Sequence, residues 1–363
     1  MKLGNEQIKG IGFEYNITLF QDFDGLSNEI LQLSNLTNIV VVTDKNVAKL
    51  YLDEINKELK KLNLPVYHII LKPSEKNKSI DRVKKVYNKL ASLGCDRKSL
   101  ILAFGGGVVG DFAGFIAATF LRGIRFAQIP TTLLACVDSS VGGKVAVNID
   151  KGKNMVGLFY QPVFVFAPIH TLSTLPLREW RCGVAEVIKH ALLSGNKKLV
   201  EALNTTKTFK NFYLSEEVKA FILESVRFKA SIVAEDEKEL GKRAILNLGH
   251  TIGHAIESFT KYKKYSHGEA VSIGLVTELV ISQEVQNLPS VVTQETVGTL
   301  KKLGMPYKEN FSMEDLIKHT KYDKKNEQGN VKFVLLQKIG EPLWGIQVEE
   351  SVLKKSWDMQ RKL

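Results

Sequence analysis

Hydrophobic positions in the first half of the chain fall into short β-branched runs, each followed by an amphipathic stretch. The runs predict buried strands, and the stretches, with apolar residues three or four apart, predict helices. The predicted strands are residues 38–43, 66–71 and 99–104, and the helices that follow them begin at Asn46, Ser79 and Asp111. Strands that alternate with helices are typical of a mainly parallel sheet covered by helices.

From Leu175 onward strand-like runs nearly vanish and helical spacing dominates. Three stretches, residues 178–193, 215–235 and 268–285, carry apolar residues at helical intervals. We therefore expect the second half of the chain to be mostly helical.

A proline-bearing connector, residues 167–176, separates the two patterns. A chain of 363 residues exceeds what one compact core usually holds, so two domains sharing one cleft are expected. We place a Rossmann-like α/β domain with a mainly parallel sheet at residues 1–172 and a mostly α-helical domain at residues 173–363. The active site is expected in the cleft between them.

Composition narrows the class of protein. With 44% hydrophobic and 25% charged residues, the chain has the composition of an ordinary globular protein. Three scattered cysteines, Cys95, Cys136 and Cys182, make no disulfide framework, and residues 1–10 carry no signal-peptide core. The longest apolar stretch, residues 99–121, holds five glycines and an acidic residue, which favours a buried strand and helix over a membrane span. We expect a cytoplasmic protein with no membrane partner.

The charge balance gives a formal net charge of +11, from 50 Lys and Arg against 39 Asp and Glu. This excess is compatible with a nucleic-acid surface, an acidic small substrate or a lysine-rich solvated exterior. Lysines lie along amphipathic stretches such as 53–62 and 81–90, and no run interleaves arginine with aromatic residues. The pattern favours a solvated exterior without a nucleic-acid partner. A nucleic-acid-binding protein would instead show binding that falls steeply with salt.

A glycine-rich turn follows the third predicted strand. Gly105, Gly107 and Gly110 form G-x-G-x-x-G, which lets backbone N–H groups approach a pyrophosphate at a helix N-terminus. The acidic residue expected at the end of the next strand is absent, because residues 125–130 run into two threonines. The dinucleotide site is therefore not of the standard kind. Asp44, at the end of the first predicted strand, is either the ribose partner or the N-cap of the next helix.

Residues 130–154 mix small and polar side chains with hydrophobic ones, as ligand-binding loops do. Two glycines before Lys144 allow a ligand to approach the backbone, while Lys144, Lys153 and Asn154 are donors suited to phosphate. A polar surface turn would explain any one of these residues, but the whole set favours a binding site.

Histidines gather in the second half at metal-ligand spacing. His250 and His254 are four residues apart and would share one helix face, and His267 ends a span of eighteen positions. Threonine at position 251 excludes the H-E-x-x-H pattern of metalloproteases. Three carboxylates are able to complete the site, and spacing does not choose among Glu186, Glu257 and Glu269. Histidine and carboxylate ligands indicate a catalytic Zn²⁺.

Taken together, these strings resemble the 3-dehydroquinate synthase family of sugar-phosphate cyclases, in one order over nearly the whole chain. The matching strings are GGGVVGD at 105–111, RG at 122–123, VDSSVGGK at 137–144, GKNM at 152–155, EVIK at 186–189, Lys229, RAILNLGHTIGH at 243–254, HGEA at 267–270 and DKK at 323–325.

The resemblance implies an NAD- and zinc-dependent enzyme, with Co²⁺ as an alternative metal. Its reaction would convert 3-deoxy-D-arabino-heptulosonate 7-phosphate to 3-dehydroquinate and phosphate, a step of the shikimate pathway of aromatic amino-acid biosynthesis. NAD⁺ would transiently oxidise a hydroxyl so that phosphate can leave. Re-reduction, ring opening and an intramolecular aldol closure would follow.

The resemblance also implies which residues act. Glu186, His250 and His267 would hold the metal, whereas His254 would face the substrate and assist proton movement. The residues implied to bind substrate are Arg122, Asp138, Lys144, Asn154, Lys189, Lys229, Arg243, Asn247, His254 and Lys324, and all of these except Arg122, Asn154 and Lys324 are also implied to be catalytic. Arg122 would reach the substrate phosphate across a homodimer interface.

The NAD site implied by the resemblance is larger than the glycine turn. Its residues would be Asp44, Glu75, Lys78, Gly105, Gly106, Gly107, Val108, Asp111, Thr131, Thr132, Leu134, Asp138, Ser139, Lys144, Lys153, Asn154 and Thr171. The chain departs from the family in two places: Ser74 replaces the usual glycine before Glu75, and Pro168 begins an unusual connector.

Two other functions compete with this interpretation. A polyol or glycerol-phosphate dehydrogenase would also pair NAD with a metal ion, but it would not need so many phosphate and carboxylate binders. A basic nucleic-acid-binding protein is the alternative outside enzymes.

Overall fold

A computed structural model describes every residue except 151, 197–198, 200–202, 204–215 and 321–330. Contacts divide the chain into two compact units. The first comprises Met1–Leu175 and Tyr213–Glu237, and the second comprises Pro176–Phe212 and Lys238–Leu363. The domain boundary at residues 172–173 and the position of a cleft stay predictions.

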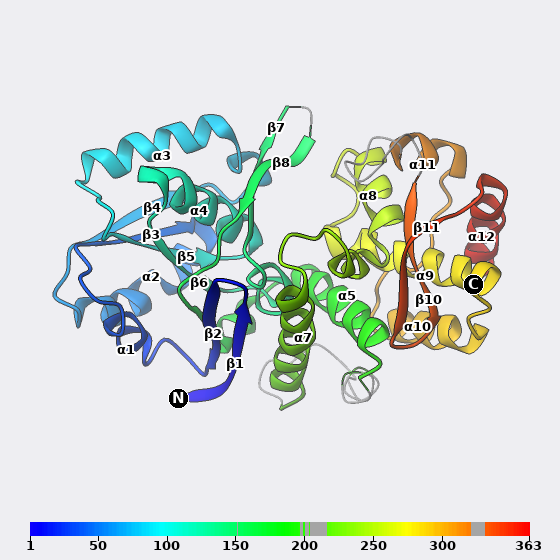
Figure 1. The fold of residues 1–363 in the computed structure, drawn as a ribbon, viewed down its shortest axis with the longest axis horizontal. Helices are drawn as coiled ribbons and strands as arrows, with labels where there is room; N and C mark the ends of the chain where they lie inside the picture. The colour runs from blue at the N-terminus through cyan, green and yellow to red at the C-terminus, as the bar shows by residue number, and fades with distance from the viewer. Residues whose placement is uncertain (151, 197–198, 200–202, 204–215, 321–330) are drawn as a thin grey trace. The chain divides into compact units, whose positions relative to one another are not determined.

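The first unit is built around a seven-stranded sheet of order β1-β2-β9-β6-β5-β3-β4 (Figure 1). Neighbours from β2 to β4 run parallel, and only β1 pairs antiparallel, with β2. This confirms the predicted mainly parallel sheet. The strands are β1 (Lys2–Gly10), β2 (Phe13–Phe20), β3 (Ile39–Asp44), β4 (Val66–Leu71), β5 (Leu100–Gly105), β6 (Arg125–Pro130) and β9 (Val165–Pro168), and a separate hairpin pairs β7 (Lys144–Ile149) with β8 (Gly152–Phe159).

Helices cover both faces of this sheet, because alternate strand residues point to opposite sides. Val40 and Val42 of β3 pack in the cluster that includes α3 and α4, while Ile39 and Val41 pack in the cluster that includes α1 and α2. The helices are α1 (Leu26–Leu31), α2 (Lys45–Lys60), α3 (Ile80–Ser92) and α4 (Gly107–Thr119), with short turns at Glu75–Asn77, Phe120–Arg122, Ala135–Ser139 and Ile169–Thr174.

One expectation about the first unit was wrong, and two hairpins were not predicted. The helix predicted from Asp111 begins four residues earlier, at Gly107, because Gly106 caps it directly after β5 and glycines hide the helical period. The hydrophobic pattern also did not predict the β1–β2 and β7–β8 hairpins. Five of the eight residues of β8 are exposed, so it lacks the apolar run that identified the central strands.

Helix α7 (Glu216–Glu235) belongs to the first unit although it follows the predicted boundary. A side chain on Gly4 of β1 would meet Leu223 at 2.8 Å, and Nε of Arg227 lies 2.8 Å from a carboxylate oxygen of Glu6. The chain therefore returns to the first unit and brings the residues of α7 to its sheet.

The second unit is mostly helical, as predicted, with one hairpin that the pattern did not predict. Phe333 and Leu335 of that hairpin pack against α8, α9 and Trp357. The elements are α5 (Leu177–Ser194), a short turn at Lys242–Asn247, α8 (His250–Phe259), α9 (His267–Gln286), α10 (Ser290–Lys302), α11 (Met313–Thr320), β10 (Lys332–Lys338), β11 (Glu341–Gln347) and α12 (Glu350–Lys362).

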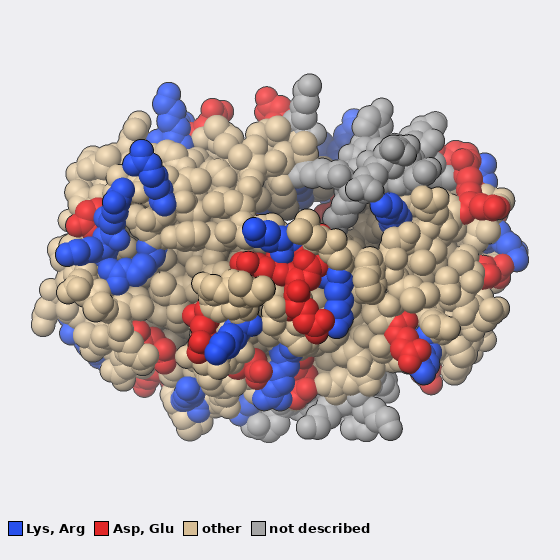
Figure 2. All heavy atoms as spheres, in the orientation of Figure 1, with Lys and Arg blue, Asp and Glu red and all other residues tan. Residues whose placement is uncertain are grey.

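Charged side chains of both signs lie on the surface, where a lysine-rich solvated exterior was expected. Figure 2 shows basic and acidic side chains interspersed over the visible face. Among the helices that the structure describes, none is both long enough and apolar enough to cross a bilayer.

Candidate active site

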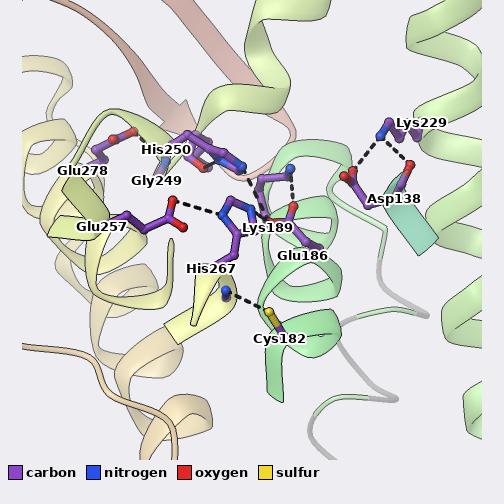
Figure 3. A network of polar contacts seen from close by, with 12 residues as sticks. Asp138, Cys182, Glu186, Lys189, Lys229, Gly249, His250, Glu257, His267 and Glu278 are labelled. Carbon is purple, nitrogen blue, oxygen red and sulfur yellow. Dashed lines mark hydrogen bonds and ion pairs between the residues drawn. The ribbon is translucent and has the colours of Figure 1, made fainter. Parts of the chain in front are cut away.

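Three helices of the second unit bring a carboxylate and two imidazoles together (Figure 3). Glu186 lies in α5, while His250 and His267 are the first residues of α8 and α9. Oε1 of Glu186 lies 3.6 Å from Nε2 of His250 and 3.5 Å from Nε2 of His267. The Glu186 side chain has no exposed surface, so its charge is directed at these partners.

The spacing of these atoms suits a zinc ion. Bonds of roughly 2.1 Å in a tetrahedron place neighbouring ligand atoms about 3.4 Å apart. The separations of 3.5 and 3.6 Å match that edge. Two histidines and one glutamate form a known catalytic zinc set that leaves a position open for substrate or water. Among the three carboxylates that spacing left open, the geometry favours Glu186.

Glu257 lies beside the other ring nitrogen of His267. A ligand atom from each of His254, Glu257 and His267 also lies within 4.8 Å of the others. However, Oε2 of Glu257 lies 3.3 Å from Nδ1 of His267, which is not the nitrogen that faces Glu186. Metal-bound histidines commonly donate their second N–H to a carboxylate, which orients the ring. Glu257 is therefore suited to hold His267 in place.

Charges around the cluster act on its two histidines in opposite directions. Burial lowers the pKa of His250 well below its ordinary value, and the neighbouring Lys189 charge adds to this effect. Burial also opposes protonation of His267, but Glu186 and Glu257 outweigh it and raise the pKa of His267 well above its ordinary value. Lys189 forms a buried ion pair with Glu186. The lowered pKa favours the neutral form of His250, which is the form that binds a metal, whereas His267 would lose a proton on binding one.

The start of α9 is fixed by contacts that the metal-ligand spacing did not indicate, although Ser266 and Glu269 stand at capping-box spacing. Ser266 and Glu269 form a capping box around the first turn, so Glu269 is engaged away from the histidine cluster. The Gly268 N–H donates to Sγ of Cys182 at 3.1 Å. A Cβ on Gly268 would lie 2.4 Å from Cα of Cys182, so α9 begins directly against α5. These contacts set the position of His267.

A second group of predicted site residues surrounds the glycine turn of the first unit. Lys78 is almost fully buried, forms an ion pair with Asp111 in α4 and donates to Oδ1 of Asn154. Nδ2 of Asn148 donates to Oε1 of Glu75 at 2.8 Å. Burial raises the pKa of Asp111, while the Lys78 charge opposes that change. The unit thus assembles a lysine, an acid and amides at one place.

The glycine turn itself is bordered by three hydroxyl residues. Helix α4 starts at Gly107, so its first backbone N–H groups have no acceptor within the helix. The N–H of Thr131 donates to the carbonyl oxygen of Gly105 at 3.1 Å. Side chains on the next two glycines would meet Thr132 and Ser139 at 3.0 Å. The turn therefore leaves its backbone donors close to hydroxyl groups, as a phosphate site requires.

Asp44 is the N-cap of α2, which was one of the two roles left open for it. Its carboxylate accepts from the N–H groups of Asn46 and Val47 at 2.8 and 3.2 Å. The ribose contact stays a prediction. The Thr171 hydroxyl donates to the carbonyl oxygen of Pro168 at 2.8 Å, so the unusual connector forms an ordered turn.

Helix α7 adds a lysine to the loop at 137–144. Nζ of Lys229 donates to the backbone oxygen of Asp138 at 2.6 Å and to its carboxylate at 2.8 Å. Lys144, the first residue of β7, is exposed, and Lys153 lies in β8. Val108 lies in the first turn of α4 and Leu134 immediately precedes the Ala135–Ser139 turn.

The remaining predicted residues of the second unit lie near the histidines in sequence. The ring centroids of His250 and His254 are 5.3 Å apart. Arg243 is buried in the Lys242–Asn247 turn, and Nδ2 of Asn247 donates to Glu239 at 2.8 Å. Lys324 lies outside the described residues. That the residue groups of the two units form one active site stays a prediction.

Comparison with protein families identifies both halves of the chain. The family described as 3-dehydroquinate synthase N-terminal matches residues 68–182, and that described as 3-dehydroquinate synthase C-terminal matches residues 183–326. The 3-dehydroquinate synthase of Leptospira interrogans serogroup Icterohaemorrhagiae serovar copenhageni is 55% identical over 333 residues, covering 92% of this chain and 91% of that protein. The 3-dehydroquinate synthase of Ruminiclostridium cellulolyticum is 42% identical over 94% of this chain and 95% of that protein.

Solved structures share the whole architecture. A 2-deoxy-scyllo-inosose synthase, complexed with carbaglucose-6-phosphate, NAD⁺ and Co²⁺, is 27% identical with a TM-score of 0.86, covering 99% of this chain and 100% of that chain. A probable glycerol dehydrogenase from Sinorhizobium meliloti has a TM-score of 0.66 at 13% identity, covering 96% of both chains, and shares the fold alone.

The orientation of His267 by Glu257 is testable by metal titration. We expect Glu257→Gln to weaken zinc binding roughly 10- to 100-fold, because the amide no longer polarises the imidazole as a carboxylate does. Competition with a chromophoric chelator measures this change. Glu295→Gln, which alters an exposed glutamate of α10, is the matched control. Equal zinc affinity in the Glu257 variant and the wild type would contradict the assigned role.

Proposed function

The chain belongs to the 3-dehydroquinate synthase family and is an enzyme of that activity in the shikimate pathway, and we propose how its residues carry out the reaction. The substrate is 3-deoxy-D-arabino-heptulosonate 7-phosphate, the products are 3-dehydroquinate and phosphate, and the cofactors are NAD and Zn²⁺, with Co²⁺ as the alternative metal. The observation that carries this proposal is the Glu186, His250 and His267 cluster at tetrahedral spacing.

The chemistry divides between two cofactors and the side chains that hold them. Bound NAD⁺ would take a hydride from the substrate carbon that bears a hydroxyl, whose O–H loses a proton, and would later return the hydride. The metal ion would polarise the substrate oxygens bound to it. Glu186, His250 and His267 hold the metal ion. Lys78, Asp111 and the glycine turn hold the dinucleotide. The further NAD contacts are those that the family resemblance implies.

Buried cations suit a substrate that carries both a carboxylate and a phosphate. Lys189, Lys229 and Arg243 are 2%, 7% and 1% exposed, and Glu186 and Asp138 pair with the first two. The anionic groups of a bound substrate would add further charges that offset the desolvation of these buried cations. We assign these side chains, with Lys144, Asn154 and Asn247, to binding the two anionic groups and orienting them for reaction. Lys324 and Asp138 complete this set in the proposal.

His254 is assigned to proton movement. It lies one helical turn after His250 on the same face of α8, with its ring in edge contact with that of His250. The geometry of the metal cluster does not require it as a ligand. An imidazole in this place is suited to pass a proton to or from the substrate hydroxyl.

A homodimer is the proposed assembly, with Arg122 reaching the phosphate bound by the other copy. Leu121, Arg122 and Gly123 have φ angles of 51°, 67° and 114°, so three successive residues adopt the left-handed region and form a distinct turn. Arg122 is exposed on this turn. A basic side chain presented in this way suits a contact outside its own chain. The cytoplasmic location stays a prediction.

The dehydrogenase alternative has weaker support. Glycerol dehydrogenases share the fold, but the matching family models and the two relatives named above are 3-dehydroquinate synthases. Three buried cationic side chains also exceed what a small uncharged polyol requires.

The function is tested by one product assay. With zinc and a small, substoichiometric amount of NAD⁺, we expect the heptulosonate phosphate to yield equal amounts of phosphate and 3-dehydroquinate, with no accumulation of NADH, since the hydride returns in each turnover. Glucose 6-phosphate and sedoheptulose 7-phosphate are the matched substrates. They lack the carboxylate, and kcat/KM should fall roughly a thousandfold. Stoichiometric NADH would instead indicate a dehydrogenase, and equal turnover of the neutral sugars would disprove the named substrate.

The assignment of Arg122 to the other copy is tested by mixing two inactive variants. Arg122→Ala should lose substrate affinity and Glu186→Gln should lose turnover. Random re-pairing of equal amounts should restore about a quarter of the wild-type activity, because each mixed dimer contains one complete site. Each variant kept alone through the same re-pairing procedure is the control. No restoration after proven mixing would show that Arg122 acts within its own chain.

A further inference from the structure

A buried glutamate on α9 points at the start of the helix that carries two of the site histidines. Glu278 has no exposed surface. Its Oε2 accepts from the N–H of Gly249 at 2.6 Å, and its Oε1 accepts from the N–H of Ile252 at 3.3 Å. Figure 3 shows this side chain beside Gly249, immediately before His250.

The first backbone N–H groups of α8 receive no side-chain cap from their own helix. The first N–H groups of a helix have no acceptor within the helix, and a side chain of the N-cap residue usually supplies one. Here the N-cap is Gly249, with φ of 79° and no side chain, so α8 makes no cap of its own. A carboxylate also interacts favourably with the positive end of the helix dipole. Glu278 therefore supplies from another helix what the sequence of α8 lacks.

Close packing makes this contact a rigid one. A Cβ on Gly274 of α9 would lie 2.0 Å from the carbonyl oxygen of Gly249, and a Cβ on Gly253 would lie 3.2 Å from Cα of Val271. The two helix backbones thus touch at two places next to the Glu278 contact. His250 follows directly, with its Nδ1 3.2 Å from the carbonyl oxygen of Leu248. A shift at the start of α8 would consequently move the imidazole that faces Glu186.

We propose that Glu278 is a positioning residue of the metal centre, which caps α8 from α9 and thereby fixes the ligand nitrogen of His250. This inference rests on the proposed metal site and adds a residue to it that makes no contact with metal or substrate. His267 is the first residue of α9, and Glu278, farther along the same helix, accepts hydrogen bonds from the start of α8. Both histidine ligands are in this way placed by one helix.

The test compares Glu278→Gln with Thr277→Val. Glutamine keeps the shape, but its amide group can accept only one of the two N–H bonds and turns a donor toward the other. Thr277→Val alters the neighbouring buried residue, whose hydroxyl donates to the carbonyl oxygen of Ile273 within α9. We expect Glu278→Gln to weaken zinc binding roughly tenfold or more. The visible absorption spectrum of the Co²⁺-loaded variant should also differ from that of the wild type, whereas Thr277→Val should match the wild type.

The readouts separate this inference from the proposed function. If the wild type binds no zinc at Glu186, His250 and His267, the proposed metal site is wrong and the inference falls with it. If the wild type binds zinc and Glu278→Gln has the same zinc affinity and Co²⁺ spectrum, only the inference is overturned. A melting temperature lowered with both metal readouts unchanged also overturns it, because that result shows a merely structural role.

Hydrogen exchange on the wild-type protein guards against a variant that does not fold. The amides of Gly249 and Ile252 should exchange at least tenfold more slowly than those at the start of α10, whose N-cap residue, Pro289, also provides no side-chain cap. Exchange as fast as that at the start of α10 would overturn the proposal.

Discussion

A charged carboxylate that no water reaches is the constraint around which the second unit is organised. Burying such a charge costs several kcal/mol unless partners surround it. Glu186 has a cation on its own helix, Lys189, and two imidazoles supplied by other helices. Those imidazoles lie at the starts of α8 and α9, where glycines let helix backbones pack in direct contact. A bound divalent cation would neutralise the same charge, so the arrangement that is costly without a metal is suited to bind one.

The first unit also brings its candidate binding groups together from separate elements, here around a glycine turn. Its central strand β5 ends in a glycine turn, and the helix that follows begins at once, which leaves backbone donors open at the carboxyl edge of the sheet. Lys78 and Asp111 place a positive and a negative group beside that turn. Helix α7, although it comes late in the sequence, contributes Lys229 to the same unit through Asp138. The separate sources of these side chains explain why no short motif contains them all.

Periodicity predicted the parts of the fold in which a single pattern runs uninterrupted. The strands at 66–71 and 125–130 and the helix at 178–193 are present as β4, β6 and α5. Residues in which the pattern is mixed were missed, since β8 is largely exposed and the hairpin of β10 and β11 interrupts a helical region. Spacing found His250 and His254 on one helix face, but could not show which carboxylate completes the metal site or that His254 is not a ligand. The family resemblance supplied that choice, and the distances of 3.5 and 3.6 Å agree with it. Glu278 had no sequence signal, because its role depends on the packing of two helices.

The central claim is that Glu186, His250 and His267 bind the metal while His254 serves another step. The most direct measurement is the zinc content of the purified wild type and of Glu186→Gln, His267→Ala and His254→Ala, read beside their turnover. We expect about one zinc ion per chain in the wild type and in His254→Ala, with turnover reduced in the latter. Glu186→Gln and His267→Ala should lose both zinc and turnover. Equal loss of zinc in all three variants would contradict this division of roles.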